Sequence, residues 1–408
     1  MKLIVIGGGA AGFWGAIACA EAYPQINITL LEASPQVLTK VRISGGGRCN
    51  VTHACFEPML LVGHYPRGAK ALRGAFTRFQ PQDTVQWFQA HGVRLKTEAD
   101  GRMFPTTNTS ETIIDCLLRT AQQLGIHLRT TAPVTHLARS DSGRFEVRLK
   151  SGEKLACDRI LLATGSHPLG YRLARQLGHP PIAPVPSLFT FKINDPRLQG
   201  LAGITVDPVQ LRLSTADEAF DQTGPLLVTH WGLSGPAVLK LSAWGARALH
   251  HSRYRGELAI HWLPQLSYEE LRQQLLQAKA QKAKRAIAKH CPVQLPQRLW
   301  QTLLTAAAIP PSQRWADLSK QNLRNLQQEL TQGRFQVKGK GVFKDEFVTC
   351  GGVDLKQIHF KTMESRFCPG LHFAGEVIDV DGITGGFNFQ NAWTTAWLAA
   401  QAIGQSLA

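Results

Sequence analysis

The stretch that most constrains the fold is the amino terminus, where a short apolar run is followed at once by closely spaced glycines. Residues 2–6 are rich in β-branched side chains, as in a buried parallel strand, and residues 7–12 read GGGAAG, which matches the GxGxxG pattern. Gly7 permits a tight turn, Gly9 lets the backbone approach a pyrophosphate, and Gly12 lets the following helix pack on the strand. This order predicts the first strand, turn and helix of a dinucleotide-binding domain.

The next segment adds a second strand and an acid at the expected distance. The helix is predicted to run to about Ala22, and its N-terminal amides and dipole would hold the phosphates. A second strand, residues 26–31, ends at Glu32, about twenty residues after the glycines, where a carboxylate accepts hydrogen bonds from both ribose hydroxyls. Because Glu32 would repel a 2′-phosphate, the ligand is predicted to be FAD or NAD rather than NADP.

Two later segments favour FAD over NAD. One strand ends in the small residues Ala163, Thr164 and Gly165, which let the chain pass close to a bound cofactor. Another strand, residues 371–374, precedes a glycine and an acid, and a glycine loop then leads to a helix that begins near Gly386. Amides at the N-terminus of such a helix stabilise the negative charge of a reduced flavin, so this combination indicates a flavin.

These motifs together resemble one family of bacterial flavoproteins. The stretches GGGAAG, KVRISGGGRCNVTH, TCGGV and FAGEVIDVDGITGGFNFQNA are similar to those of the NAD(P)/FAD-dependent oxidoreductases that include the bile-acid-inducible flavoprotein BaiN and the ribosomal RNA dihydrouridine synthases. The resemblance implies an α/β fold, in which a Rossmann-like, three-layer FAD-binding domain is interrupted by a small β-barrel and a helical subdomain. The expected boundaries are residues 1–186 and 345–408 for the FAD-binding domain, 187–265 for the β-rich insert and 266–344 for the helical insert.

The resemblance also implies which residues contact the cofactor. We expect residues 40–50 to wrap around the flavin, because a glycine backbone can approach a flat ring that side chains would block. The alternative for the three glycines of this stretch is a tight structural turn. The predicted cofactor contacts are Gly7, Gly9, Ala10, Ala11, Gly12, Glu32, Ala33, Lys40, Arg42, Ser44, Gly45, Gly46, Val134, Ala163, Thr164, Gly165, Gly375, Glu376, Asp381, Gly385, Gly386, Phe387 and Asn388.

The same stretch contains the candidate catalytic residues. Reduction of a uracil C5=C6 bond takes a hydride from flavin N5 and a proton from a nearby acid, a role that a thiol of ordinary pKa, about 8.5, can fill. Cys49 is one candidate, and the alternative for it is a small buried hydrophobic side chain. His53 is the neighbouring candidate, although a lone histidine is more often structural. Arg48 and Asn50 are expected to reach substrate.

The charge balance of the chain points to a polyanionic partner. The 45 Lys and Arg residues exceed the 29 Asp and Glu residues, which gives a formal net charge of +16. RNA is the polyanion that fits both this excess and the resemblance. The alternative is a solvated basic surface with no partner.

Many of the basic residues fall in the expected helical insert. Ser267 and Glu270 form a capping box, which predicts a helix that runs to about His290 with a row of cations along one face. Two more helices are expected near residues 294–308 and 316–331. A shared phosphate-contacting surface is one interpretation of these cations, and a solvated helix face is the other. The predicted RNA contacts are Lys279, Lys282, Arg285, Lys289, Lys338 and Lys340, and further basic clusters are Arg67, Lys70, Arg73 and Arg78, and Arg334, Lys338, Lys340 and Lys344.

Three further observations bound the function. The eight cysteines contain no CxxC pair, so neither a metal site nor a disulfide framework is expected, and free thiols predict a reducing, cytoplasmic location. No apolar run reaches the roughly 18 residues of a membrane span, and no obligate protein partner is visible. There is no second complete GxGxxG, so NAD(P)H is expected to dock transiently at the flavin face.

Three functions remain open at this point. The first is an FAD-dependent oxidoreductase that reduces uridine to dihydrouridine in ribosomal RNA with electrons from NAD(P)H, with the target base flipped onto the flavin. The second is a reductase of an activated C=C bond in a small enone or enoate, as the BaiN-like members suggest. The third is an RNA-binding flavoprotein without turnover.

Overall fold

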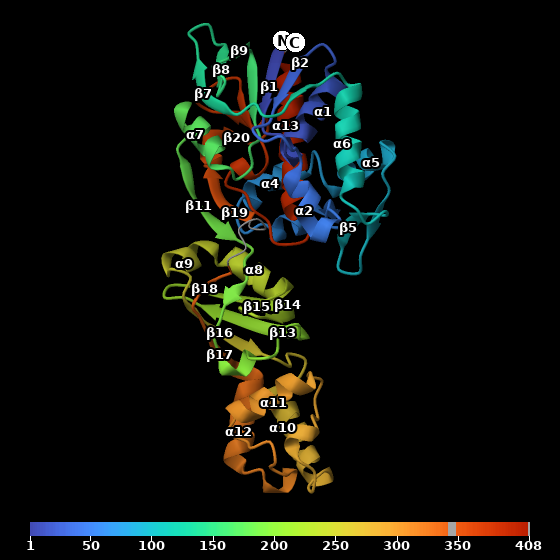
Figure 1. Cartoon of the computed structure of the whole chain (residues 1–408), viewed down its shortest axis with the longest axis vertical. Helices are drawn as coiled ribbons and strands as arrows, with labels where there is room; N and C mark the ends of the chain where they lie inside the picture. Colours follow the sequence, from blue (N-terminus) through green and yellow to red (C-terminus); the bar gives the residue numbers. More distant parts are fainter. Residues whose placement is uncertain (342–347, 407–408) are drawn as a thin grey trace. The chain divides into compact units, whose positions relative to one another are not determined.

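The computed structural model describes residues 1–341 and 348–406, and the chain forms two compact units (Figure 1). The first, which we call the Rossmann unit, comprises residues 1–185 together with the chain from Val348 onward. The second, which we call the inserted unit, comprises residues 186–347. Lys344, one of the predicted basic residues, lies outside the described residues.

A seven-stranded sheet forms the centre of the Rossmann unit. Its first strand is buried along almost its whole length, because the apolar run that predicted it faces neighbours on both sides of the sheet. The five strands from β22 to β6 are parallel, and β21 and β20 are added antiparallel at one edge. The order is β20 (Ile358–His359), β21 (Glu364–Ser365), β22 (Leu371–Phe373), β10 (Arg159–Leu162), β1 (Lys2–Ile6), β2 (Asn27–Leu31) and β6 (His127–Arg129).

Helices from both ends of the chain cover one face of this sheet. The predicted glycine-turn helix is α1 (Ala10–Ala22), and it packs against α13 (Phe387–Gln405) and α6 (Glu111–Gln123) (Figure 1). Trp14 of α1 is buried against Trp393 of α13, with ring centroids 4.9 Å apart. This packing places the amino-terminal glycine turn beside the beginning of the carboxy-terminal helix.

The third layer and the connecting elements complete the Rossmann unit. The antiparallel strands β7 (Val134–Arg139), β8 (Phe145–Leu149) and β9 (Lys154–Cys157) lie on the side of the sheet away from α6 in Figure 1, beside α7 (Pro168–Gln176). Strand β11 (Pro181–Ser187) pairs with β19 (Val348–Val353), so the chain leaves and re-enters this unit on neighbouring strands. The other elements are α2 (Thr39–Gly47), β3 (Thr52–His53), α3 (Pro58–Leu61), α4 (Ala69–Phe76), α5 (Pro81–Ala90), β4 (Leu95–Thr97) and β5 (Arg102–Pro105).

The inserted unit begins and ends in a second seven-stranded sheet, which is antiparallel. Helix α8 (Pro236–Trp244) packs on strands of this sheet and is followed by α9 (Ala246–His251). The two outer strands, β17 and β18, are separated in sequence only by Lys338. The order is β17 (Gly333–Val337), β16 (Gly256–His261), β13 (Thr205–Ser214), β14 (Ala219–Thr229), β15 (Gly232–Ser234), β12 (Phe191–Lys192) and β18 (Gly339–Lys340).

Three helices extend the core of this sheet. They are α10 (Tyr268–Gln281), α11 (Gln297–Ala306) and α12 (Lys320–Gln332), and their buried leucines and tryptophans join those of the strands in one cluster. Strands β17 and β18 belong to the sheet although they fall inside the segment predicted as the helical insert, so the helical part ends before Gly333.

The predicted helix that reaches His290 is wrong in its length. Helix α10 starts at the foreseen capping box but ends at Gln281. The following backbone pairs instead with the segment before Trp315, since Trp315 N donates to Arg285 O (3.0 Å) and Ile287 N donates to Gln313 O (2.9 Å). The row of cations predicted on one helix face is therefore divided between the last turn of a helix and a loop.

Among the helices of residues 1–341 and 348–406, none combines the length and the apolar character that crossing a bilayer requires.

Candidate functional site

The glycine turn after β1 has the close approaches that its spacing predicts at Gly7 and Gly12. Gly7 has a φ of +114°, and a Cβ added there would lie 2.4 Å from the carbonyl oxygen of Ala163. A Cβ at Gly12 would lie 1.8 Å from the carbonyl oxygen of Gly7, whereas a Cβ at Gly9 would meet no atom within 4 Å. Gly7 and Gly12 are thus required by packing, while Gly9 borders open space at the N-terminus of α1, where a phosphate can approach the amides.

Glu32 joins the end of β2 to this turn. Its Oε2 accepts a hydrogen bond from Gly8 N (2.7 Å), and its Oε1 accepts one from Ser34 N (2.8 Å). The carboxylate therefore lies beside the glycines, as predicted, and its contact with a ribose stays a prediction. Four other predicted contacts lie at or next to the ends of elements. They are Ala10 and Ala11 in the first turn of α1, Ala33 directly after Glu32, and Val134, buried at the start of β7.

A second cluster brings together predicted cofactor residues from three distant segments. Lys40 Nζ lies 2.6 Å from Glu376 Oε2 and 3.0 Å from Ser166 Oγ, and Glu376 Oε1 accepts a hydrogen bond from Thr349 N (2.8 Å). In the neighbouring turn, the buried Thr164 Oγ1 has no hydrogen-bond partner among the described residues. A Cβ added at Gly170 would lie 1.8 Å from this oxygen, so the hydroxyl is packed against the backbone of Gly170 and does not by itself indicate a ligand.

The stretch of three glycines begins as helix and ends in left-handed backbone. Residues 39–43 form the helical part of α2, and Ser44 then leaves the helical conformation. Gly45, Gly46 and Gly47 have φ values of +58°, +69° and +82°. These values account for the glycines as a turn, and Gly46 and Gly47 also border open space, where a flat ring can lie against the backbone.

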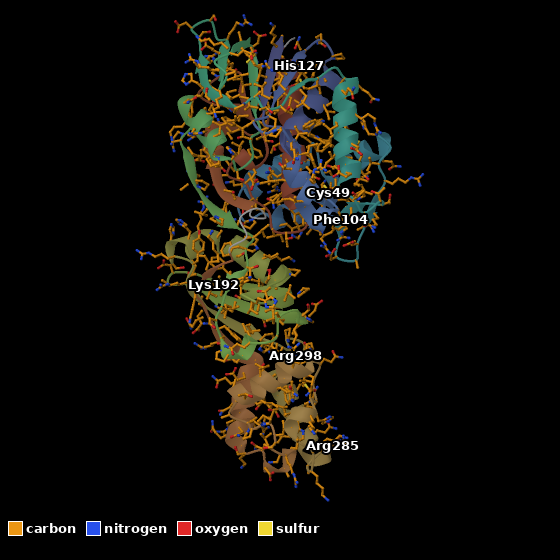
Figure 2. All side chains as sticks on the ribbon, in the orientation of Figure 1. Cys49, Phe104, His127, Lys192, Arg285 and Arg298 are labelled. Atoms are coloured by element: carbon orange, nitrogen blue, oxygen red, sulfur yellow. The ribbon has the colours of Figure 1, made fainter. Side chains whose placement is uncertain are left out.

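The two arginines of this stretch are held by carboxylates. Arg42 forms an ion pair with Glu111, and Arg48 forms one with Glu98 at 2.7 Å. The Arg48 guanidinium also lies 4.0 Å from the ring centroid of Phe104. Figure 2 shows Phe104 in the same region as Cys49. Contacts of Arg42 with cofactor and of Arg48 with substrate would require these side chains to exchange partners.

Cys49 and Asn50 are enclosed rather than presented to solvent. Cys49 is fully buried at a φ of +59°, and burial raises the pKa of its thiol to about 12. This placement fits the alternative of a small buried side chain and argues against a thiol that gives up a proton near neutral pH. Asn50 bridges two elements, because its side-chain amide donates to Thr52 O and accepts from Gly386 N, both at 3.0 Å. Asn50 thereby ties residue 52 to Gly386, the residue directly before α13.

Two histidines flank the beginning of α13, and the sequence indicated only one of them. His53 stacks on Phe387 with ring centroids 4.6 Å apart, and its Nδ1 lies 3.0 Å from the carbonyl oxygen of Gly385. His64 stacks on the same phenyl ring at 4.3 Å. No local pattern marks His64 as a site residue, since it becomes one only through this stacking. Both imidazoles are half-buried.

Two predicted cofactor residues near α13 have structural partners. Asp381 is fully buried and forms an ion pair with Arg67, whose Nε lies 2.6 Å from Asp381 Oδ1. The Asn388 amide spans Gly382, donating to its carbonyl and accepting from its N–H, each at 2.9 Å. The buried pair with Asp381 neutralises the charge of Arg67, which argues against Arg67 as part of a phosphate-contacting cluster. Within that cluster, Arg78 donates to Lys361 O (2.6 Å), and Lys70 and Arg73 are exposed on α4.

The donor set of the Rossmann unit fits a flavin dinucleotide. An open helix N-terminus next to Gly9 suits a pyrophosphate, and an acid at the end of β2 suits a ribose. The open faces of Gly46 and Gly47 suit a flat ring, and the N-terminus of α13 suits its negative edge.

In the inserted unit, the predicted RNA contacts do not form one surface. Lys279 donates from Nζ to Leu318 O (2.6 Å) and is half-buried, whereas Arg285 and Lys289 are exposed on the loop after α10. Lys338 is exposed, and Lys340 Nζ lies 5.5 Å from the ring centroid of Tyr254. Lys282 is half-buried at the end of α10.

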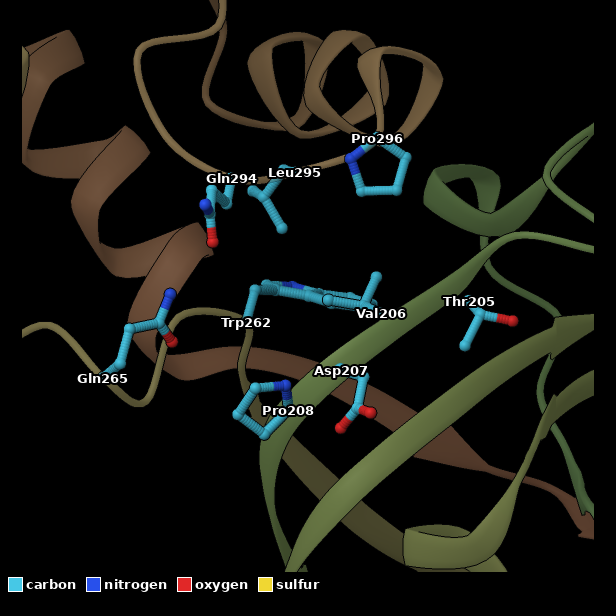
Figure 3. A pocket seen from close by; sticks show the side chains of 9 residues that line it. All are labelled: Thr205, Val206, Asp207, Pro208, Trp262, Gln265, Gln294, Leu295 and Pro296. Carbon is cyan, nitrogen blue, oxygen red and sulfur yellow. The ribbon is translucent and has the colours of Figure 1, made fainter. Parts of the chain in front are cut away.

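The inserted unit also contains a cavity of about 460 Å³ (Figure 3). The indole of Trp262 lies at its centre but is only 1% exposed, so its ring face is already covered by neighbours. None of the predicted site residues lines this cavity, and it is therefore a feature apart from the predicted cofactor contacts. Its lining residues are Thr205, Val206, Asp207, Pro208, Trp262, Gln265, Gln294, Leu295 and Pro296.

Comparison with known proteins identifies the family. The model of the HI0933-like protein Rossmann domain matches residues 1–402. The chain belongs to this family. It is 32% identical to the ribosomal RNA dihydrouridine synthase of Escherichia coli K12, covering 98% of this chain and 96% of that enzyme, and 30% identical to the synthase of Haemophilus influenzae, covering 98% of both. It is 27% identical to the 3-dehydro-bile acid delta(4,6)-reductase of Clostridium scindens, again over 98% of both.

Solved structures agree with the family in fold. The 3-ketosteroid delta1-dehydrogenase of Sterolibacterium denitrificans is matched with a TM-score of 0.52 at 11% identity, over 99% of both chains. The 3-ketosteroid-delta4-(5alpha)-dehydrogenase of Rhodococcus jostii is matched with a TM-score of 0.50 at 15% identity, over 98% of this chain and 97% of that one. These likenesses concern the fold alone.

The comparisons confirm the predicted fold class and the predicted kind of enzyme. This chain is an FAD-dependent oxidoreductase with a Rossmann-like α/β fold, and its cofactor is FAD. The alternative of a flavoprotein without turnover is therefore set aside. The roles of the individual site residues stay predictions.

Proposed function

We propose that this oxidoreductase reduces uridine to dihydrouridine in ribosomal RNA, with electrons from NAD(P)H. The observation that carries the proposal is the similarity, over almost the whole of each chain, to two enzymes named ribosomal RNA dihydrouridine synthase. The net charge of +16 supports a polyanionic substrate. Ribosomal RNA lies in the cytoplasm, the reducing location that the free cysteines predict.

The chain's own residues bind and orient the reactants. When bound, the flavin supplies hydride transfer to the C5=C6 bond of the base. The amides at the start of α1 hold the pyrophosphate, and Glu32 accepts from the ribose. Gly46 and Gly47 would leave the ring face uncovered, and the N-terminus of α13, whose preceding residue Gly386 is held by Asn50, would stabilise negative charge on the ring.

His53 is the proton donor in this proposal. Its imidazole is half-buried at the start of α13, and its orientation is fixed by Gly385 O and by the ring of Phe387. With Nδ1–H donating to a carbonyl, the proton for the base comes from Nε2 of the protonated imidazole, which is left as the neutral Nδ1–H tautomer. Cys49, the other candidate, is fully enclosed and has a raised pKa.

The test is the dihydrouridine content of ribosomal RNA from cells with and without this gene, measured by mass spectrometry of nucleosides. We expect dihydrouridine to be lost on deletion and restored by the wild-type chain. His53→Gln, purified with FAD bound, should restore it poorly, whereas Cys49→Ala should restore it fully. An unchanged nucleoside profile in every RNA fraction would exclude the RNA substrate.

A second candidate function has its own support. The similarity to the 3-dehydro-bile acid delta(4,6)-reductase covers the chain to the same extent, at 27% identity. In that case the protein reduces a C=C bond conjugated to a carbonyl in a small molecule, and its charge is incidental. NAD(P)H oxidation by the purified holoenzyme, with steroid enones and with ribosomal RNA as alternative acceptors, distinguishes the two substrates.

A further inference from the structure

The helices of the inserted unit contain far more cations than acids. Between Glu270 and Glu329 the chain has a single acid, Asp317, against ten basic residues. A surface of this composition repels copies of itself and attracts polyanions. The ten are Arg272, Lys279, Lys282, Lys284, Arg285, Lys289, Arg298, Arg314, Lys320 and Arg324.

Several of these cations are occupied by partners within the unit. Arg298 donates to the carbonyl oxygen of Gly200, and Figure 2 shows it at the end of the helices next to the sheet of the same unit. Arg272 pairs with Glu269 at 3.0 Å, and Lys279 donates to a backbone carbonyl. Arg298 and Lys279 join separate segments of the unit, and Arg272 pairs with a neighbour on its own helix, so a polyanion would have to displace these contacts.

Four other cations gather at the opposite end of the helices. Figure 2 shows Arg285 at this end, with its side chain directed outward. The loop after α10 lies antiparallel to the segment before Trp315, and Ala286 and Arg314 face each other in a β-bridge. We call this cluster the basic tip. It consists of Lys284, Arg285, Lys289 and Arg314, which are all exposed and whose side chains form no ion pair or hydrogen bond with any described residue.

The backbone under the basic tip is fixed by a buried core. Trp300 and Trp315 are fully buried and stack with ring centroids 6.5 Å apart. Trp300 Nε1 donates to the carbonyl oxygen of Ile287 (3.0 Å), which lies between two of the four cations in sequence. Since the loop is held in place before any partner binds, binding does not carry the additional entropy cost of ordering its backbone.

The chemistry of the basic tip selects phosphates in a nucleic acid backbone. Two of its four residues are arginines, whose planar guanidinium matches a phosphate with two parallel hydrogen bonds. No large apolar side chain is exposed among residues 282–317, all of which the structure describes, so the tip offers nothing to insert between lipid chains. Charge without apolar area is typical of a contact with a sugar–phosphate backbone.

We propose that the basic tip docks on the phosphate backbone of the RNA substrate and thereby holds the inserted unit on the RNA. This inference rests on the proposed function, because it takes RNA as the substrate. It differs from the surface predicted from the sequence, since it leaves out Lys279 and Lys282 and adds Lys284 and Arg314. The tip supplies affinity and orientation, and it does not read the identity of the target base.

The test compares two variants that lose the same charge. The tip variant carries Lys284→Gln, Arg285→Gln, Lys289→Gln and Arg314→Gln. The control variant carries Arg94→Gln, Lys150→Gln, Lys361→Gln and Arg366→Gln, at four exposed cations of the Rossmann unit whose side chains form no ion pair or hydrogen bond with the described residues. Binding of the holoenzymes to protein-free ribosomal RNA is measured by fluorescence anisotropy between 0.05 and 0.3 M salt, alongside FAD absorbance, Tm and dihydrouridine formation.

We expect the tip variant to bind RNA at least about tenfold more weakly at 0.15 M salt and to lose roughly 3 from the slope of log K against log salt, since each phosphate contact contributes about 0.7–0.9. Its FAD content and Tm should match those of the control variant. Equal RNA binding by the two variants would overturn the proposal for the tip even if the wild type forms dihydrouridine. Wild-type binding to vesicles of phosphatidylglycerol but not to RNA would also overturn it, in favour of a lipid surface. A wild type that binds RNA through the tip without forming dihydrouridine would refute the proposed function alone.

Discussion

Replacing Gly9 by alanine should separate cofactor binding from folding. The backbone at Gly9 has a φ of −93° and a ψ of −169°, which alanine adopts without strain, and an added Cβ would meet no atom within 4 Å. The apoprotein should therefore fold as well as the wild type or gain about 0.4–1 kcal/mol, because the unfolded chain loses freedom. The new methyl group, however, stands where a pyrophosphate must approach the amides at the start of α1.

The expected loss of FAD affinity follows from that position. If the methyl group displaces the phosphate from one amide, a charge-assisted hydrogen bond worth about 1.5–3 kcal/mol is lost. The Kd for FAD should then rise by about 10- to 150-fold. The assay is titration of the apoprotein with FAD, followed by quenching of flavin fluorescence, together with urea unfolding of the apoprotein.

Gly12→Ala serves as the contrasting variant. Its Cβ would lie 1.8 Å from the carbonyl oxygen of Gly7, so the turn or the helix must move, at a cost of about 1–3 kcal/mol or more. We expect this variant to lose stability without FAD and with it. Wild-type FAD affinity in Gly9→Ala would refute the placement of the pyrophosphate, and an apoprotein destabilised by more than about 1 kcal/mol would show that Gly9 is needed for packing instead.

Three further predictions concern buried groups. Cys49→Ala loaded with FAD should retain turnover, because burial raises the pKa of the enclosed thiol to about 12. A loss of turnover of about 100-fold, which is the size of a general-acid contribution, would instead identify Cys49 as the proton donor. Burial lowers the pKa of His372 from 6.5 to about 4, so the unfolded state takes up the proton first. As the pH is lowered from 6.5 to 4, the free energy of unfolding should fall by up to about 1.4 kcal/mol per pH unit, and above pH 6.5 this contribution should stay constant. Urea unfolding at a series of pH values measures this change. If His372→Gln shows an equally steep fall, other groups cause it. Arg67→Met should lower the free energy of unfolding, measured with denaturant, by about 3–5 kcal/mol, because it leaves Asp381 charged and enclosed. The double variant Arg67→Met with Asp381→Asn should recover part of that loss. An unchanged stability in the single variant would contradict the buried pair.

Features that depend on a few neighbouring residues could be predicted from the sequence. The glycines at residues 7–12 require particular backbone angles and close approaches, and any chain with this spacing meets the same steric limits. The start of α10 was predictable for a similar reason, because Ser267 and Glu270 satisfy each other's backbone amides within four residues. The helix that begins after Gly386 is a third such case.

Features that depend on distant partners could not be predicted in this way. Arg67 and Arg48 looked like free cations because their acids lie far along the chain, Asp381 for the first and Glu98 for the second. The end of α10 had no stop signal, since the segment after it leaves the helix to pair with the backbone around Arg314. In each case a tertiary contact overrode what local composition favoured.

The pairing of β11 with β19 has a consequence for how such enzymes diverge. Because the outgoing and returning strands are neighbours, the polypeptide between them is attached at one place on the Rossmann unit. The inserted unit can then be replaced through two adjacent splice points, while the Rossmann unit keeps its sheet order. A hybrid in which the aligned segment of the bile acid relative replaces residues 186–347 of this chain needs no other junction.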